Sequence, residues 1–210
     1  LSDLNIPFYS YWIDKNNIEE SGFYFVIKNI GLDFFSNIKN KLKDFFQDNP
    51  FFFPYSIAFN QEIKFGGSDH YKMAEELFFE VQPTINSIIN NRNKCLMYIL
   101  FSINHMNIML NEVSTYYFYK TINNNHNLSL KDIIDKEKTY KMNINNKQEK
   151  VLLNNDAIKF DIEFDFSVLN KISKYFQIQI FDRVLSMLFL NDAEKRQIVQ
   201  LLRDQNFTNV

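Results

Sequence analysis

The chain has 210 residues, with 23 Lys and Arg against 25 Asp and Glu and a formal net charge of −2. Its content of 46% hydrophobic and 23% charged residues is close to the globular average, which excludes an intrinsically disordered chain. The near-neutral balance supplies no overall positive field, so we expect neither nucleic acid nor an anionic membrane as the partner. The length fits a single domain, residues 1–210, with a sizeable core.

Cysteine content and hydropathy exclude further classes of protein. Cys95 is the only cysteine, so internal disulfides and cysteine-based zinc sites are excluded. No apolar run reaches about 18 residues. The nearest, residues 95–110, contains two asparagines and a histidine, so we expect no membrane span and a cytoplasmic protein. The richness in Phe and Asn points to an AT-rich genome, and the start at Leu1 instead of Met leaves open a processed N-terminus.

The N-terminal part, residues 1–66, combines predicted strands with a predicted helix. Residues 8–13 and 23–30 are aromatic and β-branched runs separated by polar residues and a glycine, which predicts a hairpin. Apolar residues then recur at spacings of three and four over residues 33–46, the pattern of an amphipathic helix. Residues 51–59 contain a proline, so a strand there would lie at a sheet edge.

The second part, residues 67–120, is predicted to form the core helices. Ser68 or Asp69 is available to cap the first of them. Pro83 is expected to break or kink that helix, or to sit in the first turn of the next. Residues 84–119 then carry apolar side chains around most of a helix, so we expect one long helix here that serves as the central scaffold.

The remaining chain divides into a polar excursion, residues 121–156, and a C-terminal part, residues 157–210. We expect a strand at 158–166, a helix at 167–190 and a last helix that begins with a capping residue near Asn191. The predicted fold is therefore α+β and mostly helical, with a small antiparallel sheet packed on a long central helix. An all-α bundle is the alternative.

Three carboxylates within residues 158–166 form the first candidate site. Apolar and polar residues alternate without a fault in this segment, which places Asp161, Glu163 and Asp165 on one face of a strand. Side chains two apart on a strand stand about 6.7 Å from one another, too far to share a cation unless they lean together. We therefore predict that these acids face water, with a metal site as the alternative.

The second candidate is an E-x-K pair, Glu62 and Lys64, which has the spacing found in metal-dependent nucleases. In such enzymes a strand presents the carboxylate and the lysine on one face, and a second carboxylate comes from a neighbouring strand. Asp48 is the only acid a short distance upstream. This set supports the alternative function of a metal-dependent nuclease or other hydrolase.

The third candidate is a carboxylate–histidine metal centre made by facing helices. Glu76 and Glu80 are four apart on one predicted helix, and His105 and Glu112 are seven apart on the next. The Glu-x-x-His spacing of di-iron bundles is absent, so surface acids and a hydrogen-bonded histidine are the simpler interpretation. Neither G-x-x-x-x-G-K-[ST] nor G-x-G-x-x-G occurs, and we expect no cofactor.

The function favoured by the sequence is a non-catalytic protein-binding or assembly module, such as a subunit or fragment of a larger complex. Aromatic residues at 51–55 and 116–119 are the predicted contact surfaces for a protein partner. The same aromatics could instead belong to the core. The oligomeric state stays open.

Overall fold

The computed structural model describes residues 7–13, 22–27, 36, 40, 60–123 and 160–204. These residues are mostly helical and include one two-stranded antiparallel sheet, which confirms the mostly helical α+β class. In chain order the elements are β1 (Phe8–Ile13), β2 (Gly22–Ile27), α2 (Asn60–Lys64), α3 (Ser68–Ile88), α4 (Arg92–His105), α5 (Leu110–Asn123), the 3-10 helix η3 (Phe166–Lys171), α7 (Lys174–Met187) and α8 (Asp192–Asp204).

The two N-terminal strands form the predicted hairpin. Phe8 pairs with Ile27 and Ile13 with Gly22, and residues 28–30 of the predicted second strand lie outside the described residues. Aromatic side chains fill the inner face: the ring of Tyr11 lies parallel to that of Tyr24, with centroids 5.4 Å apart. β1 packs against both α3 and α7 and is buried on both faces at its centre.

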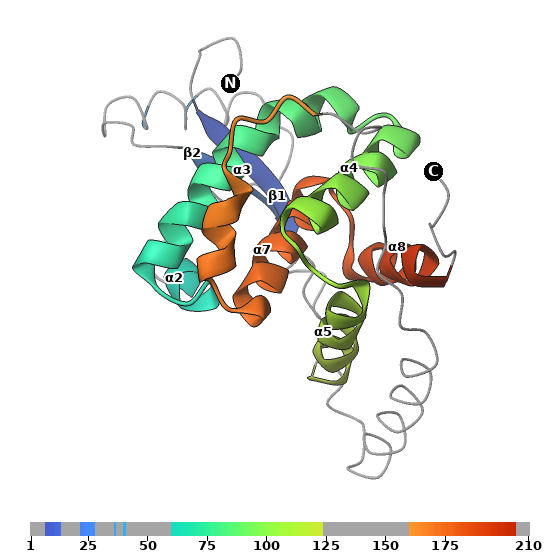
Figure 1. The fold of residues 1–210 in the computed structure, drawn as a ribbon. Coiled ribbons are helices and arrows are strands. Elements are labelled where there is room, and N and C mark those ends of the chain that lie inside the picture. The colour runs from blue at the N-terminus through green and yellow to red at the C-terminus, as the bar shows by residue number, and fades with distance from the viewer. Residues whose placement is uncertain are drawn as a thin grey trace.

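The central helix of the described fold is α7, which contradicts the prediction for residues 84–119. Every residue from Gln177 to Met187 is buried. Figure 1 shows α7 inside the molecule, and it contacts β1, α3, α4 and α5. A helix buried on all sides is normally apolar throughout, so the polar residues that α7 carries need partners inside the protein.

The predicted long helix at 84–119 is in fact the end of α3, all of α4 and most of α5. Asn91 ends the first run, because its extended backbone and its side-chain oxygen, which accepts from the Lys94 N–H, start α4. Asn107 ends the second, with a φ of 51° in the left-handed region that asparagine tolerates better than most residues. Local asparagine chemistry therefore overrides a continuous apolar pattern.

Helix α3 starts earlier and ends later than predicted. Its N-cap is Gly67, with a φ of 113°, and no side chain caps it, so neither Ser68 nor Asp69 has that role. Pro83 lies inside the helix and does not break it. Because proline has no N–H group, it removes one hydrogen bond of the helix. That cost is offset by the apolar face that α3 buries over its whole length.

Residues 160–165 are extended but belong to no strand of the described sheet. The predicted alternation nevertheless holds, with apolar side chains half-buried and acids exposed. Phe160 packs edge-on against Tyr98 of α4, with centroids 5.2 Å apart. The backbone is bound by side chains of α3, since Glu80 Oε1 accepts from the Glu163 N–H at 3.2 Å. Helix side chains thus replace the neighbouring strand.

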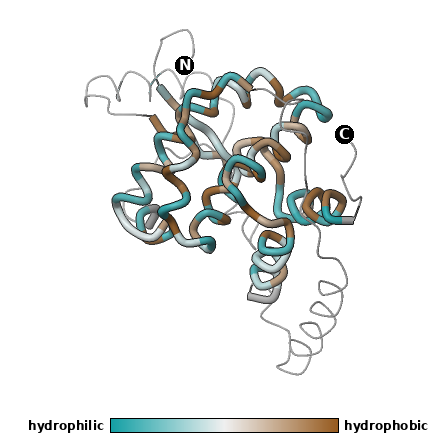
Figure 2. The backbone as a smooth tube through the Cα atoms, in the orientation of Figure 1, coloured by the Kyte–Doolittle hydropathy of each residue, from teal (hydrophilic) through white to brown (hydrophobic). Residues whose placement is uncertain are grey.

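The predicted helix at 167–190 is two elements, η3 and α7, and the helix after it begins as predicted. Asn191 Oδ1 accepts from the Ala193 and Glu194 N–H groups, while Glu194 Oε2 accepts from the Asn191 N–H. This reciprocal pair is a capping box. α8 packs against α5, and Figure 2 shows hydrophilic and hydrophobic positions alternating along it.

Several predicted segments lie outside the described residues. They are most of the helix predicted at 33–46, the aromatic run at 51–55, and the polar excursion beyond the end of α5. Among the described helices, none combines the length and the apolar character that crossing a membrane requires.

Candidate functional site

The polar side chains on α7 are the starting point of the site, because they are buried inside the protein. Burial of a polar group without a hydrogen bond is costly, so each such group requires partners. The buried polar residues of α7 are Gln177, Gln179, Asp182, Arg183 and Ser186.

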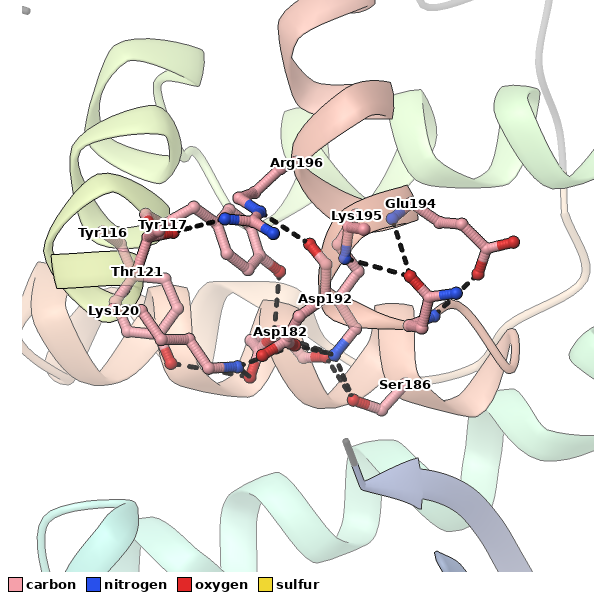
Figure 3. Close-up of polar contacts among 12 residues, drawn as sticks. Tyr116, Tyr117, Lys120, Thr121, Asp182, Ser186, Asp192, Glu194, Lys195 and Arg196 are labelled. Atoms are coloured by element: carbon pink, nitrogen blue, oxygen red, sulfur yellow. Dashed lines mark hydrogen bonds and ion pairs between the residues drawn. The ribbon is translucent and has the colours of Figure 1, made fainter. Parts of the chain in front are cut away.

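Asp182 is the centre of a cluster that joins three helices. Tyr117 of α5 donates its hydroxyl hydrogen to Asp182 Oδ1 at 2.7 Å. Lys195 of α8 lies 3.0 Å from the same oxygen, and Lys120 of α5 lies 3.5 Å from Oδ2. Figure 3 shows these side chains converging from α5, α7 and α8. Asp192 adds a second carboxylate, 2.9 Å from Lys120 and 3.6 Å from Lys195.

The cluster keeps Asp182 ionised despite its burial. Burial alone would raise the pKa of this carboxyl group, but the nearby Lys195 and Lys120 ammonium groups outweigh it and hold the pKa well below its usual value. Burial, followed by the Asp182 charge, raises the pKa of Tyr117 far above its usual value. Charges of opposite sign are therefore fixed and paired in the interior.

Ser186 and Lys195 have the spacing of a catalytic pair but not its chemistry. Lys195 Nζ donates to Ser186 Oγ at 2.6 Å, and serine–lysine pairs act as nucleophile and base in some hydrolases. Lys195 is instead bound to the buried Asp182 carboxylate, with Nζ 3.0 Å from Oδ1. Ser186 and Lys195 are also only 5% and 3% exposed, so the pair is inaccessible to substrate and serves the structure.

Two further cations lie on the hairpin side of the cluster. The Arg183 guanidinium carbon is 3.5 Å from the centroid of the Tyr11 ring, a close cation–π contact. Lys64 of α2 has its Nζ 5.8 Å from the Phe65 ring centroid. Burial, helped by the Arg183 charge, lowers the pKa of Lys64 to about 8. Burial first, and the nearby positive charge second, disfavour protonation of Lys64.

A groove opens beside the cluster, between α5 and the start of α7. Its volume is about 560 Å³, within the range of ligand pockets. Three tyrosines line it, Tyr116 and Tyr119 from α5 and Tyr175 from α7. Glu112, Thr115 and Lys120 of α5 and Ile178 of α7 complete the lining. We call this feature the tyrosine groove.

The tyrosine groove has exposed walls on a fixed base. Tyr175 is 60% and Tyr119 40% exposed. Tyr116 is half-buried, and its ring stands edge-on to that of Tyr175 with centroids 6.4 Å apart. Tyr116 OH also lies 3.5 Å from Asp182 Oδ2, and Lys120 belongs to both the groove and the cluster. The buried charges therefore hold one wall of the groove in place.

The two charged residues of the tyrosine groove differ in their partners. Lys120 is neutralised by Asp192 and Asp182, whose charges outweigh burial and raise its pKa. Glu112 accepts a hydrogen bond from the Met109 N–H at 3.0 Å and so caps the first turn of α5. Within the described residues Glu112 forms no ion pair. Glu112 is therefore a groove carboxylate without a cationic side chain paired to it in that part of the chain.

The structure does not give the E-x-K pair the arrangement that the nuclease hypothesis requires. Glu62 and Lys64 lie on the short helix α2, not on a strand. Residues two apart on a helix point in directions about 200° apart. Glu62 is exposed and Lys64 half-buried, which fits this geometry. Asp48 lies outside the described residues.

The acids of the 160–165 segment are placed as the sequence predicted. Asp161, Glu163 and Asp165 are all exposed. Asp165 caps η3, and its hydrogen bonds from the Ser167 hydroxyl and N–H hold its pKa below the usual value. All three carboxylates therefore face solvent in the described part of the chain.

The residues of the predicted carboxylate–histidine centre have separate roles. Glu76 is exposed, and Glu80 binds the 160–165 backbone. His105 stacks on the Phe101 ring at 3.8 Å and hydrogen-bonds the Phe101 carbonyl oxygen through Nδ1. Glu112 caps α5. Among the residues that the structure describes, no three of the types His, Cys, Asp and Glu gather in a way that could hold a metal ion.

Sequence reasoning missed Asp182 and Lys195, the centre of the cluster. One signal was available: residues 178–188 are a mostly apolar helical run in which Asp182 and Arg183 are the charged residues, in adjacent positions. A charged pair inside such a run predicts buried charges that need partners. The identity of those partners depends on how α5 and α8 pack, which the sequence pattern does not specify.

Comparison of the chain with protein-family models, with curated proteins and with solved structures finds no match.

Proposed function

We propose that this chain is a non-catalytic protein-binding module that contacts its partner through the tyrosine groove. The observation that carries the proposal is the groove itself, a recess of about 560 Å³ with three tyrosine rings in its walls. Tyrosine is enriched in binding surfaces because its ring offers a large contact area and its hydroxyl group a hydrogen bond.

The buried cluster supports this function by fixing the groove before a partner arrives. Tyr116 and Lys120 are held by Asp182, so the inner wall loses little conformational freedom on binding. The side chains of Tyr119 and Tyr175 are 40% and 60% exposed to solvent. Of the aromatic run predicted as a contact surface, residues 116–119, Tyr117 belongs instead to the buried cluster.

The alternative of a metal-dependent nuclease is not favoured by any feature of the described residues. Glu62 and Lys64 diverge on α2, and the acids of the 160–165 segment are solvent-exposed. The catalytic spacing of Ser186 and Lys195 occurs where substrate has no access. The exposed aromatic side chains of the groove favour a binding role instead.

The proposal is tested by comparing two matched double variants. The chain is used to capture partners from its native source, and each captured protein is then purified and its affinity measured by calorimetry. Tyr119→Ala/Tyr175→Ala removes the exposed walls of the groove. Phe23→Ala/Phe25→Ala removes two aromatics of β2 that are 41% and 39% exposed and lie outside the groove.

The expected result is a loss of affinity of at least about tenfold for the tyrosine variant and a change within about twofold for the phenylalanine variant. Circular dichroism and thermal unfolding verify that both variants fold. An unchanged affinity in the tyrosine variant, with the folded state intact, would show that the groove is not the contact surface.

A further inference from the structure

We infer that the tyrosine groove accepts an arginine side chain from the partner protein. This inference rests on the proposed function and deepens it by stating the chemistry of the occupant. Three features of the groove point to it: the faces of its rings, the carboxylate of Glu112 and its open form.

The tyrosine rings form an environment that attracts cations. The face of an aromatic ring carries negative electrostatic potential, so a cation within about 6 Å of the ring centre is stabilised. The protein already uses this interaction at the base of the groove. Lys120 Nζ lies 6.0 Å from the Tyr116 centroid and 5.8 Å from the Tyr117 centroid. Tyr119 and Tyr175 offer the same chemistry on the exposed side.

The charge of the groove has the sign that a cationic guest requires. Lys120 has its charge balanced by Asp192 at 2.9 Å and by Asp182 at 3.5 Å. Glu112 lines the groove and caps the first turn of α5, and it forms no ion pair within the described residues, so the groove carries its negative charge. A guest cation would form an ion pair with this carboxylate, whereas a guest anion would be repelled by it.

The open form of the groove favours a guanidinium group over an ammonium group. With Tyr175 60% and Tyr119 40% exposed, the walls do not enclose a guest on all sides. A flat, weakly hydrated guanidinium can stack on one exposed ring and still donate hydrogen bonds to a carboxylate. The protein contains such a stack, since the Arg183 guanidinium lies 3.5 Å from the Tyr11 centroid.

The test compares two peptides that differ in charge but hardly in shape. Acetyl-Gly-Arg-Gly-amide and the same peptide with neutral citrulline in place of arginine are titrated into the chain at low ionic strength. Chemical shifts of the tyrosine rings are followed by NMR. Glu112→Gln removes the carboxylate charge and keeps an oxygen for the Met109 N–H, and Glu76→Gln makes the same change at an exposed site on α3.

We expect the arginine peptide to shift the Tyr119 and Tyr175 resonances in a saturable manner. The citrulline peptide should bind at least about fivefold more weakly. Glu112→Gln should weaken arginine binding by about threefold or more, and Glu76→Gln should leave it unchanged. Equal binding of the two peptides, or no saturable shift with the arginine peptide, overturns the inference.

The two experiments fail in distinguishable ways. Loss of a purified partner in Tyr119→Ala/Tyr175→Ala, together with equal binding of the arginine and citrulline peptides, would leave the contact surface in place and reject only its cationic occupant. Retention of the partner in that double variant would reject the contact surface itself.

Discussion

Asp182 is the residue on which the polar interior depends. Its two oxygens take part in contacts with α5 and α8, and it is itself on the central helix α7. Breaking a buried ion pair leaves the remaining charge in a medium of low polarizability, which costs more than the pair contributed. The two helices that line the tyrosine groove, α5 and α7, are therefore joined to each other and to α8 through one carboxylate.

We predict that Asp182→Asn lowers the free energy of unfolding by about 3 to 5 kcal/mol. The amide keeps the size of the side chain but leaves the Lys195 ammonium group, 3% exposed, with the Asp192 carboxylate at 3.6 Å as its remaining charge partner among the described residues. Urea denaturation at neutral pH measures the effect. Asp161→Asn is the control, because Asp161 is exposed and should change stability by less than about 0.5 kcal/mol. Equal effects of the two variants would show that the buried carboxylate carries no special stability.

For Lys64 we predict that a substitution raises the free energy of unfolding instead of lowering it. Its pKa is about 8 in the folded chain and 10.5 in its usual state, so the unfolded chain binds more protons between these values. Stability should therefore rise as pH increases from about 8 to about 10.5, and the full penalty is present below pH 8. Lys64→Met should be more stable than the wild type by roughly 1 to 2 kcal/mol at pH 7.

The measurement for Lys64 is the difference in unfolding free energy between Lys64→Met and the wild type across pH 7 to 10.5. The difference should shrink towards zero at the upper end of this range. Lys72→Met, at an exposed position on α3, should show a small difference that does not depend on pH. A difference at Lys64 that stays constant with pH would refute the role assigned to its burial.

At the scale of elements, the start of α8 provides the clearest prediction. Asn191→Ala removes the side-chain acceptor for the Ala193 and Glu194 N–H groups and should cost about 1 kcal/mol. Gln197→Ala, at an exposed position in the same helix, should change stability by less than about 0.5 kcal/mol. The midpoints of thermal unfolding of the two variants measure this difference. Equal midpoints would mean that α8 does not need its cap.

Elements governed by local chemistry could be predicted from the sequence. The hairpin followed from its aromatic runs, and the start of α8 from its capping residue. The alternation at 160–165 predicted burial but not the element, because side chains of α3 bind this backbone in place of a second strand. The prediction of one long helix at 84–119 was wrong because Asn91 and Asn107 interrupt the helix. Apolar periodicity continues across both breaks and so does not reveal them.

The candidate site could be predicted only in fragments. Tyr116 and Tyr119 were within a predicted contact surface, and the exposure of Asp161 was predicted correctly. The cluster was missed because its contacts join distant parts of the chain: Tyr117 and Asp182 are 65 residues apart. Such contacts depend on the packing of whole helices, and sequence periodicity describes only which face of each helix is buried.

At the scale of the whole molecule, α7 links the hairpin to the tyrosine groove. It contacts β1 and α3 on one side and α5 on the other, as Figure 1 shows. Arg183 stacks on Tyr11 in the hairpin, while its neighbour Asp182 holds Tyr117 and Lys195. Polar side chains thus cross the interior from the hairpin to Tyr116 and Lys120, the half-buried residues that line the groove on α5.

The most direct test of the proposed contact surface is hydroxyl-radical footprinting of the chain alone and in complex with its purified partner. The method reports the solvent exposure of individual side chains. We predict that oxidation of Tyr119 and Tyr175 falls strongly in the complex. Oxidation of Phe23 and Phe25, whose side chains are 41% and 39% exposed in the free chain, should stay unchanged. Protection of the two phenylalanines with unchanged tyrosines would contradict the account.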